Sequence, residues 1–172
     1  MKIGVISDTH VLQPIPWLEY IVKAHFNDVD AIFHTGDFVG LEAFNLFDGK
    51  KVYAVSGNMD TEEVKKALPT RLVVDVAGKR FGLIHGLGGP QTVERQLLEE
   101  FLGAGIDCLV FGHTHCPFNG IVDDVLCFNP GSPTDRRYAP FNSVGLLHVD
   151  DTIKGEIRIV DERRWHGSPV RT

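Results

Sequence analysis

KIGVISDTH, residues 2–10, has the pattern of a buried β-strand that runs directly into an aspartate and a histidine. AIFHTGD, residues 31–37, and KVYAVSGN, residues 51–58, repeat the arrangement, with an apolar run before a glycine and an acid or amide. Two helical patterns separate these three strand segments: apolar residues at helical spacing over Ile15–Phe26, and a short helical pattern at Leu41–Phe47. Strands that alternate with helices in this way predict parallel strands joined by crossover helices.

The pattern changes after residue 70. Arg71–Val76 and Arg80–His85 flank a turn of hairpin length, and the last strand patterns follow one another without helices, which favours an antiparallel section. The other elements are expected as a helix that ends at Leu68 after a capping box at Asp60-Thr61-Glu62-Glu63, a helix at Gln91–Leu102, and strands at Asp107–Phe111, Val125–Phe128, Ser143–Val149 and Gly155–Val160. We therefore expect an α/β fold, a mixed sandwich of two sheets with helices outside, as one domain over residues 1–172 with a surface tail from about Asp161.

Composition excludes several classes of protein. The 17 basic and 23 acidic residues give a net charge of −6, so a basic surface for nucleic acid is not expected. No apolar run is long enough for a transmembrane helix, and Asp8 comes too early for a signal peptide. The 3 cysteines lack CxxC spacing and indicate neither a disulfide framework nor a cysteine zinc site. We expect a cytoplasmic protein without membrane contact.

Metal-ligand residue types follow five of the expected strands. They are Asp8 with His10, then Asp37, then Asn58, then His85, and finally His113 with His115. Each is a weak signal alone, because a single histidine is more often structural than a ligand. Ligands of α/β sheets collect beyond the carboxyl ends of strands, so five such ends predict one shared site.

In this order the motifs resemble the calcineurin-like metallophosphoesterase superfamily, whose pattern is DxH, GDxxG, GNH followed by an acid, a lone histidine, and GHxH. The matching segments are Asp8-Thr9-His10, Gly36-Asp37-Phe38-Val39-Gly40, Gly57-Asn58-Met59-Asp60, His85-Gly86 and Gly112-His113-Thr114-His115. The short chain and Asn129-Pro130-Gly131-Ser132 are similar to the small, single-domain phosphodiesterase branch of bacteria and archaea. One position departs from the pattern, because Met59 stands where the GNH motif has histidine.

The resemblance implies a four-layer α/β/β/α fold and a centre of two divalent metal ions. By motif position, one ion would be held by Asp8, His10, Asp37 and His115, and the other by Asp37, Asn58, His85 and His113, with Asp37 as the bridge. Carboxylate and imidazole ligands without thiolate suit Mn²⁺ foremost, with Ni²⁺, Fe²⁺ or Zn²⁺ as alternatives. A hydroxide that bridges the ions would attack the phosphorus, and Asp37, Asn58 and His85 are expected to be catalytic as well as metal-ligating.

Met59 bears on the substrate, because the GNH histidine of relatives steadies or protonates the leaving oxygen. A thioether does neither, which favours small-molecule phosphodiesters with acidic leaving groups over monoesters with poor ones, or else a surrogate proton donor from elsewhere in the chain. A phosphomonoesterase and a non-catalytic, metal-binding scaffold for protein interaction stay open as alternatives, as does a homo-oligomer. Specificity is expected in loops such as Pro117–Asp124 and Pro130–Pro140, where Arg136 and Arg137 are candidate phosphate ligands.

Overall fold

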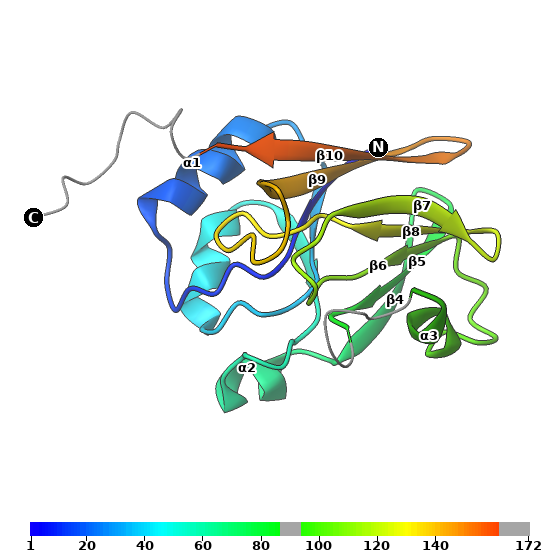
Figure 1. Ribbon diagram of the computed structural model, residues 1–172, viewed down its shortest axis with the longest axis horizontal. Coiled ribbons are helices and arrows are strands. Elements are labelled where there is room, and N and C mark those ends of the chain that lie inside the picture. Colours follow the sequence, from blue (N-terminus) through cyan, green and yellow to red (C-terminus); the bar gives the residue numbers. More distant parts are fainter. Residues whose placement is uncertain (87–93, 162–172) are drawn as a thin grey trace, which may run out of the picture.

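Two five-stranded β-sheets pack against each other at the centre of the protein, as a computed structural model that describes residues 1–86 and 94–161 shows (Figure 1). The first sheet has the order β10 (Ile153–Val160), β9 (Asn142–Val149), β1 (Lys2–Ile6), β2 (Ala31–His34) and β3 (Lys51–Ala54). The second has the order β4 (Arg71–Val76), β5 (Lys79–Ile84), β6 (Cys108–Val110), β8 (Val125–Asn129) and β7 (Phe118–Val122). Both sheets are mixed, with β1, β2 and β3 parallel in one and β5, β6 and β8 parallel in the other.

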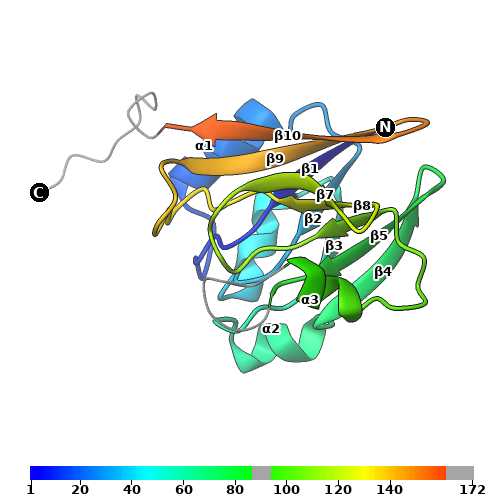
Figure 2. The same cartoon turned by 45° about the vertical axis from the view of Figure 1, so that its right-hand side comes forward.

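Helices cover the outer face of each sheet. In β1, Ile3 packs into the core between the sheets, whereas Ile6 packs into the core under α1 (Pro16–His25) and η1 (Leu41–Phe47), as the two-residue alternation of a strand requires. On the opposite side, Leu97 of α3 (Glu94–Glu99) packs against the outer face of the second sheet (Figure 2). The layers therefore run helix, sheet, sheet, helix, which confirms the expected four-layer α/β/β/α sandwich.

A close approach between α1 and the first sheet depends on Gly4. A Cβ atom at this position would lie 2.8 Å from the ring of Phe26, which follows α1 and is fully buried. Any side chain there would push α1 away from the sheet. The glycine in KIGVISDTH therefore sets the spacing of the first two layers.

The antiparallel section expected for the last strands is confirmed for β9 and β10, which pair antiparallel, but Val125–Phe128 belongs to the other sheet. Strand β8 lies parallel to β6 and pairs antiparallel only with β7, a strand within the segment Pro117–Asp124 that we expected to be a loop. Strand β7 is at the edge of the sheet and has no fully buried side chain. Because an edge strand does not need a fully apolar face, its sequence shows no strong alternation of apolar and polar residues. The turn after it uses Asp123 and Asp124, both at positive φ, as two-residue hairpin turns require.

The expected capping box before α2 (Glu62–Ala67) is also wrong. Thr61 is the N-cap residue of this helix, but its side chain makes no capping hydrogen bond. The Asp60 carboxylate accepts hydrogen bonds from the backbone N–H groups of Asp37 and Val39 in another loop and of Gly57 in its own loop instead. The helix expected at Gln91–Leu102 is present as α3 but ends at Glu99, three residues early, and residues 91–93 and the tail from residue 162 lie outside the described residues.

Candidate metal centre

The seven candidate ligands follow the carboxyl ends of strands that face one end of the sandwich. Asp8 and His10 follow β1, Asp37 follows β2, Asn58 follows β3, His85 follows β5, and His113 and His115 follow β6. Because β1–β3 are parallel to one another and β5 is parallel to β6, each set of strands ends at one edge of its sheet. The structure therefore brings together all seven residues that the sequence singled out.

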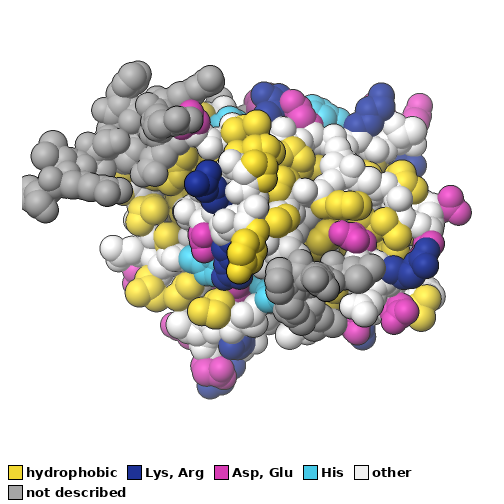
Figure 3. All heavy atoms as spheres, viewed as in Figure 1, with side chains coloured by type: hydrophobic (Ala, Val, Ile, Leu, Met, Phe, Trp, Pro, Cys, Tyr) yellow, Lys and Arg dark blue, Asp and Glu magenta, His cyan; other side chains and the backbone are white. Residues whose placement is uncertain are grey.

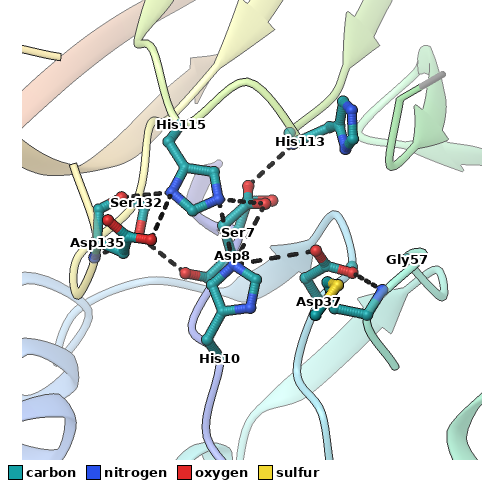
Figure 4. A network of polar contacts seen from close by, with 12 residues as sticks. Ser7, Asp8, His10, Asp37, Gly57, His113, His115, Ser132 and Asp135 are labelled. Atoms are coloured by element: carbon teal, nitrogen blue, oxygen red, sulfur yellow. Dashed lines mark hydrogen bonds and ion pairs between the residues drawn. The ribbon is translucent and has the colours of Figure 1, made fainter. Parts of the chain in front are cut away.

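Asp8, His10 and His115 form the first group of potential metal ligands (Figure 4). The Nε2 atom of His115 lies 3.3 Å from Asp8 Oδ1, and the Nε2 atom of His10 lies 4.0 Å from the same oxygen. The two Nε2 atoms are 3.1 Å apart. Two imidazole nitrogens and a carboxylate oxygen therefore face one small volume.

Asp8, Asp37 and His85 form the second group, which Asn58 and His113 extend. Asp37 Oδ2 lies 3.2 Å from His85 Nε2 and 3.9 Å from His10 Nε2, so this carboxylate reaches both groups. Asn58 Oδ1 is 3.2 Å from His85 Nε2 and 3.0 Å from His113 Nδ1. Asp8 belongs to both groups as well, so two carboxylates, and not Asp37 alone, lie between them.

The hydrogen bonds of two histidines fix the direction of their lone pairs. His85 Nδ1 donates to the Thr35 carbonyl at 2.7 Å, and His115 Nδ1 donates to the Asp135 carbonyl. In the neutral rings Nε2 then carries a lone pair that faces a carboxylate oxygen. Two lone pairs face each other favourably only with a cation between them, either a proton or a metal ion.

Asp8 Oδ1 is the clearest sign that a cation belongs here. The Asp8 side chain is fully buried, and among the described residues this oxygen has no hydrogen-bond partner. Its other oxygen accepts a hydrogen bond from the backbone N–H of His113 at 3.0 Å. A buried carboxylate oxygen without a partner carries a large desolvation cost, which a bound divalent ion would offset.

The pKa values of the group show the same need for positive charge. Burial lowers the pKa of His85, but its hydrogen bond to Asp37 and the charges of Asp8 and Asp37 outweigh burial, so the pKa lies above its ordinary value. Burial also lowers the pKa of His115, and the negative charge of Asp8, 3.3 Å away, outweighs burial and raises the pKa. Burial raises the pKa of Asp37, yet His85, the backbone N–H of Met59 and His10 bring it below its ordinary value. In the absence of metal, His85 and His115 therefore bind protons more readily than an ordinary histidine.

Five candidate ligands adopt left-handed backbone conformations, which sequence reasoning did not foresee. Their φ angles are 54° at Asp8, 49° at His10, 56° at Asp37, 69° at His113 and 58° at His115. Such residues cost roughly 1–3 kcal/mol each and cluster at functional sites. Asp and His tolerate this region better than most residues, so the ligand types themselves fit the turns that hold them.

Two glycines permit the loops to approach. A Cβ atom at Gly57 would lie 2.2 Å from Asp37 Oδ1, and one at Gly112 would lie 1.9 Å from Ser7 Oγ and 2.7 Å from Asp8 Oδ2. Both glycines stand in the motifs, beside Asn58 and His113. They are needed because the carboxylates occupy the space of a side chain.

Asp60 ties the loops of Asp37 and Asn58 together. Its carboxylate accepts hydrogen bonds from the backbone N–H groups of Gly57 and Val39 at 2.7 Å each and from that of Asp37 at 3.2 Å. The residue is 4% exposed. The sequence did offer a signal for this role, because Asp60 is the acid that follows the GNH-like motif, but we assigned it to a helix cap.

The Asn129-Pro130-Gly131-Ser132 segment supports the first group. Asn129 Nδ2 donates to the Gly112 carbonyl at 3.0 Å, and Ser132 Oγ donates to the Asp8 carbonyl at 2.8 Å. Thr134 Oγ1 donates to the Thr9 carbonyl at 3.0 Å. Sequence reasoning noted the segment but did not place it at the centre.

His34 acts as a link between loops. Its Nδ1 accepts a hydrogen bond from the Gly36 backbone N–H at 3.2 Å, and its Nε2 lies 3.3 Å from Thr9 Oγ1. The ring stacks on Phe38 and is fully buried, which lowers its pKa well below the ordinary value. A neutral histidine therefore joins the Asp8 and Asp37 loops without ligating.

The centre is partly open to solvent. The His10 side chain is 20% exposed, and the face in Figure 3 shows histidine side chains at the surface beside basic and acidic ones. A cavity of about 650 Å³ adjoins the second group and is lined by Asn58, His85, Lys65, Arg71 and Ile84, among others. Its volume is in the range of small-molecule sites. Among the described residues, no helix has the length and apolar character that crossing a membrane requires.

Comparison with known proteins places the chain in a family. Residues 1–152 match the calcineurin-like phosphoesterase superfamily domain. A probable metallophosphoesterase of Methanocaldococcus jannaschii is 38% identical over 167 residues, which are 94% of this chain and 83% of that protein. A phosphodiesterase of the same organism is 31% identical over 174 residues, which cover 92% of this chain and 97% of that one.

Solved structures share the fold. An archaeal phosphodiesterase superimposes with a TM-score of 0.75 at 26% identity, covering 93% of this chain and 100% of its own. Vps29 of Entamoeba histolytica with Zn²⁺ superimposes with a TM-score of 0.71 at 23% identity, covering 92% and 99%, a likeness of fold alone. The chain belongs to the calcineurin-like phosphoesterase superfamily, whose members are metal-dependent.

Proposed function

We propose that the protein is a phosphodiesterase that holds two divalent metal ions at the seven strand-end residues. The observation that carries this proposal is the pair of carboxylate–imidazole groups that share Asp8, whose buried Oδ1 has no hydrogen-bond partner among the described residues. A carboxylate shared between two ligand groups is the arrangement that two closely spaced ions require.

The ligand sets are those that the motif positions imply, and the place of Asp37 Oδ2, 3.2 Å from His85 Nε2 and 3.9 Å from His10 Nε2, supports Asp37 as the carboxylate common to both. Asp8, His10, Asp37 and His115 would hold one ion, and Asp37, Asn58, His85 and His113 the other. Oxygen and nitrogen donors without a nearby thiolate fit Mn²⁺, Ni²⁺, Fe²⁺ or Zn²⁺, and we propose Mn²⁺. When bound, such ions supply a nucleophilic water at neutral pH and neutralise charge that builds on the phosphoryl group.

The chain's own residues orient the site. The Thr35 and Asp135 carbonyls hold His85 and His115 with Nε2 toward the carboxylates, and Asp60 fixes the backbone of Asp37. These bonds position the groups before substrate arrives, which reduces the reorganisation that the reaction requires.

Met59 supports a diester as substrate. Its backbone N–H donates to Asp37 Oδ1 at 2.8 Å, which places the residue at the centre, and it is 55% exposed. A thioether donates no proton to a leaving oxygen, so hydrolysis favours esters with acidic leaving groups. The names of the phosphodiesterase relatives agree with this choice. The cavity beside His85 gives the second half of a small diester a place to lie.

The test compares diester and monoester hydrolysis by metal-free protein reconstituted with each of the four metals. Bis(p-nitrophenyl) phosphate is the diester, p-nitrophenyl phosphate is the monoester, and Asp37→Asn is the matched variant of nearly equal shape. We expect kcat/KM to be higher for the diester, to depend on added metal and to be lost in the variant. Equal or higher monoester activity would indicate a phosphomonoesterase. Metal binding without hydrolysis of either ester would indicate a scaffold.

A further inference from the structure

We propose that Arg137, and not its neighbour Arg136, binds the phosphate group of the substrate at the His10–His115 side of the metal centre. The proposal rests on the proposed function, because it assigns a residue to the recognition of that substrate. The sequence offers two adjacent arginines, and the structure separates them by what their side chains contact.

The loop that carries Arg137 is attached to the candidate ligands by hydrogen bonds. Ser132 Oγ donates to the Asp8 carbonyl at 2.8 Å and accepts from the backbone N–H of Asp135 at 3.0 Å. His115 Nδ1 donates to the Asp135 carbonyl (Figure 4). The residue two positions before Arg137 is therefore in direct contact with a candidate ligand.

Arg137 itself turns back toward this contact. Its backbone N–H donates to Asp135 Oδ1 at 3.1 Å, its φ angle is 45°, and its Nε lies 3.5 Å from Asp135 Oδ2. The same Oδ2 lies 3.7 Å from His115 Nδ1. The guanidinium, one carboxylate and the His115 ring therefore form a continuous cluster at the edge of the centre.

Arg136 lies elsewhere. Its Nη1 donates to the Pro140 carbonyl at 3.3 Å, and it lines a separate cavity of about 360 Å³ with Trp17, Phe141 and Val160. None of these residues is a candidate ligand. Arg136 therefore serves as a matched control, one position away on the same loop and with the same charge.

The chemistry of the guanidinium fits phosphate. Among the described residues, Asp135 is the only side chain that pairs with Arg137, and it does so through Nε, so the Nη groups are available to two phosphate oxygens. The anchored backbone holds the base of the side chain in place, which lowers the entropy lost when a ligand binds. A lysine keeps the charge but not the two-pronged geometry.

The experiment measures inorganic phosphate binding by calorimetry and diester kinetics in Mn²⁺-loaded wild type, Arg137→Ala, Arg137→Lys and Arg136→Ala. We expect Arg137→Ala to weaken phosphate binding and raise KM by about 10- to 100-fold, the range of a lost charge-assisted hydrogen bond, with a smaller change in kcat. Arg137→Lys should recover part of the loss, and Arg136→Ala should stay within about twofold of wild type. Metal content measured on each variant should be equal.

Unchanged phosphate affinity and KM in Arg137→Ala would overturn the assignment, as would equal losses in the two alanine variants. Loss of metal from Arg137→Ala would also overturn it, because the residue would then support the ligands. A wild type that binds phosphate but hydrolyses no diester would contradict the proposed function, while the phosphate titrations would still decide the role of Arg137.

Discussion

Replacement of Asp60 by alanine should destabilise the protein and weaken metal binding together. The carboxylate is 4% exposed and accepts three backbone N–H groups, from Asp37, Val39 and Gly57. Hydrogen bonds to a charged group contribute about 1.5–3 kcal/mol each. The three share one carboxylate and are not additive, so we expect a loss of about 3–5 kcal/mol in the free energy of unfolding.

For a chain of this size each kcal/mol corresponds to about 2–4 °C, which predicts a fall in Tm of roughly 6–20 °C. The loops of Asp37 and Asn58 lose their common anchor, and such supporting contacts are typically worth about 10- to 100-fold in metal affinity. Thermal unfolding by circular dichroism and Mn²⁺ titration by calorimetry measure the two effects.

Asp75→Ala is the matched control, because Asp75 is exposed and pairs with Arg80 at 2.8 Å on the surface. Its Tm should stay within about 2 °C of wild type. Asp60→Asn keeps the shape but presents an amide N–H₂ to one or more backbone donors, so its Tm should lie between those of wild type and Asp60→Ala. If Asp60→Ala matches the Asp75→Ala control in Tm and binds Mn²⁺ as wild type does, Asp60 does not join the two loops.

The other predictions concern the centre itself. Asp37→Ala should abolish activity and remove most bound metal, and two ions per folded chain by elemental analysis would refute its role. His113→Ala and His115→Ala should each lower metal occupancy while circular dichroism stays native, and failure to fold in excess metal would make either histidine structural. Met59→His should raise kcat/KM for alkyl monoesters more than for activated diesters, since general acid catalysis is worth about 10²- to 10⁴-fold where the leaving group is poor; an unchanged ratio would remove the chemical reason for diester preference. The pKa values of His85 and His115 are raised above the ordinary 6.5, so the stability that their ion pairs give the metal-free protein should be complete below pH 6.5 and fall as pH rises through the raised values. Mn²⁺ affinity should change in the opposite sense, falling as pH drops through the same window, because metal displaces these protons; a pH-independent affinity by calorimetry would contradict the assignment.

The sequence predicted the layers because apolar periodicity is a local property. The strand of residues 2–6, the helix that contains Trp17 and the hairpin that flanks Ala77 and Gly78 all appear where their patterns place them. The edge strand Phe118–Val122 was missed because an edge strand buries little and carries weak alternation. The parallel pairing of Val125–Asn129 with Cys108–Val110 depends on that missed strand, so no local signal indicated it.

The seven candidate ligands were identified because each follows a strand end, a position that topology brings into one place. The residues that hold the ligand loops in place were not identified, because their role depends on three-dimensional contacts that the spacing of residues along the sequence does not reveal. Asp60 has the sequence context of a helix cap. Its carboxylate instead accepts hydrogen bonds from a loop more than twenty residues away and from the nearby Gly57. The hydrogen bond from Ser132 to the Asp8 carbonyl joins residues 124 positions apart in the sequence. The different contacts of the Arg136 and Arg137 side chains follow from the backbone turn at Arg137, where φ is positive.

The most direct test of the central claim is a titration of metal-free protein with Mn²⁺ while hydrolysis of bis(p-nitrophenyl) phosphate is followed. Two ions that share Asp37 predict little activity after the first equivalent and a steep rise to a plateau at two equivalents per chain. A plateau at one equivalent would contradict the two-metal centre, and diester hydrolysis that does not depend on Mn²⁺ would contradict the metal-dependent phosphodiesterase itself.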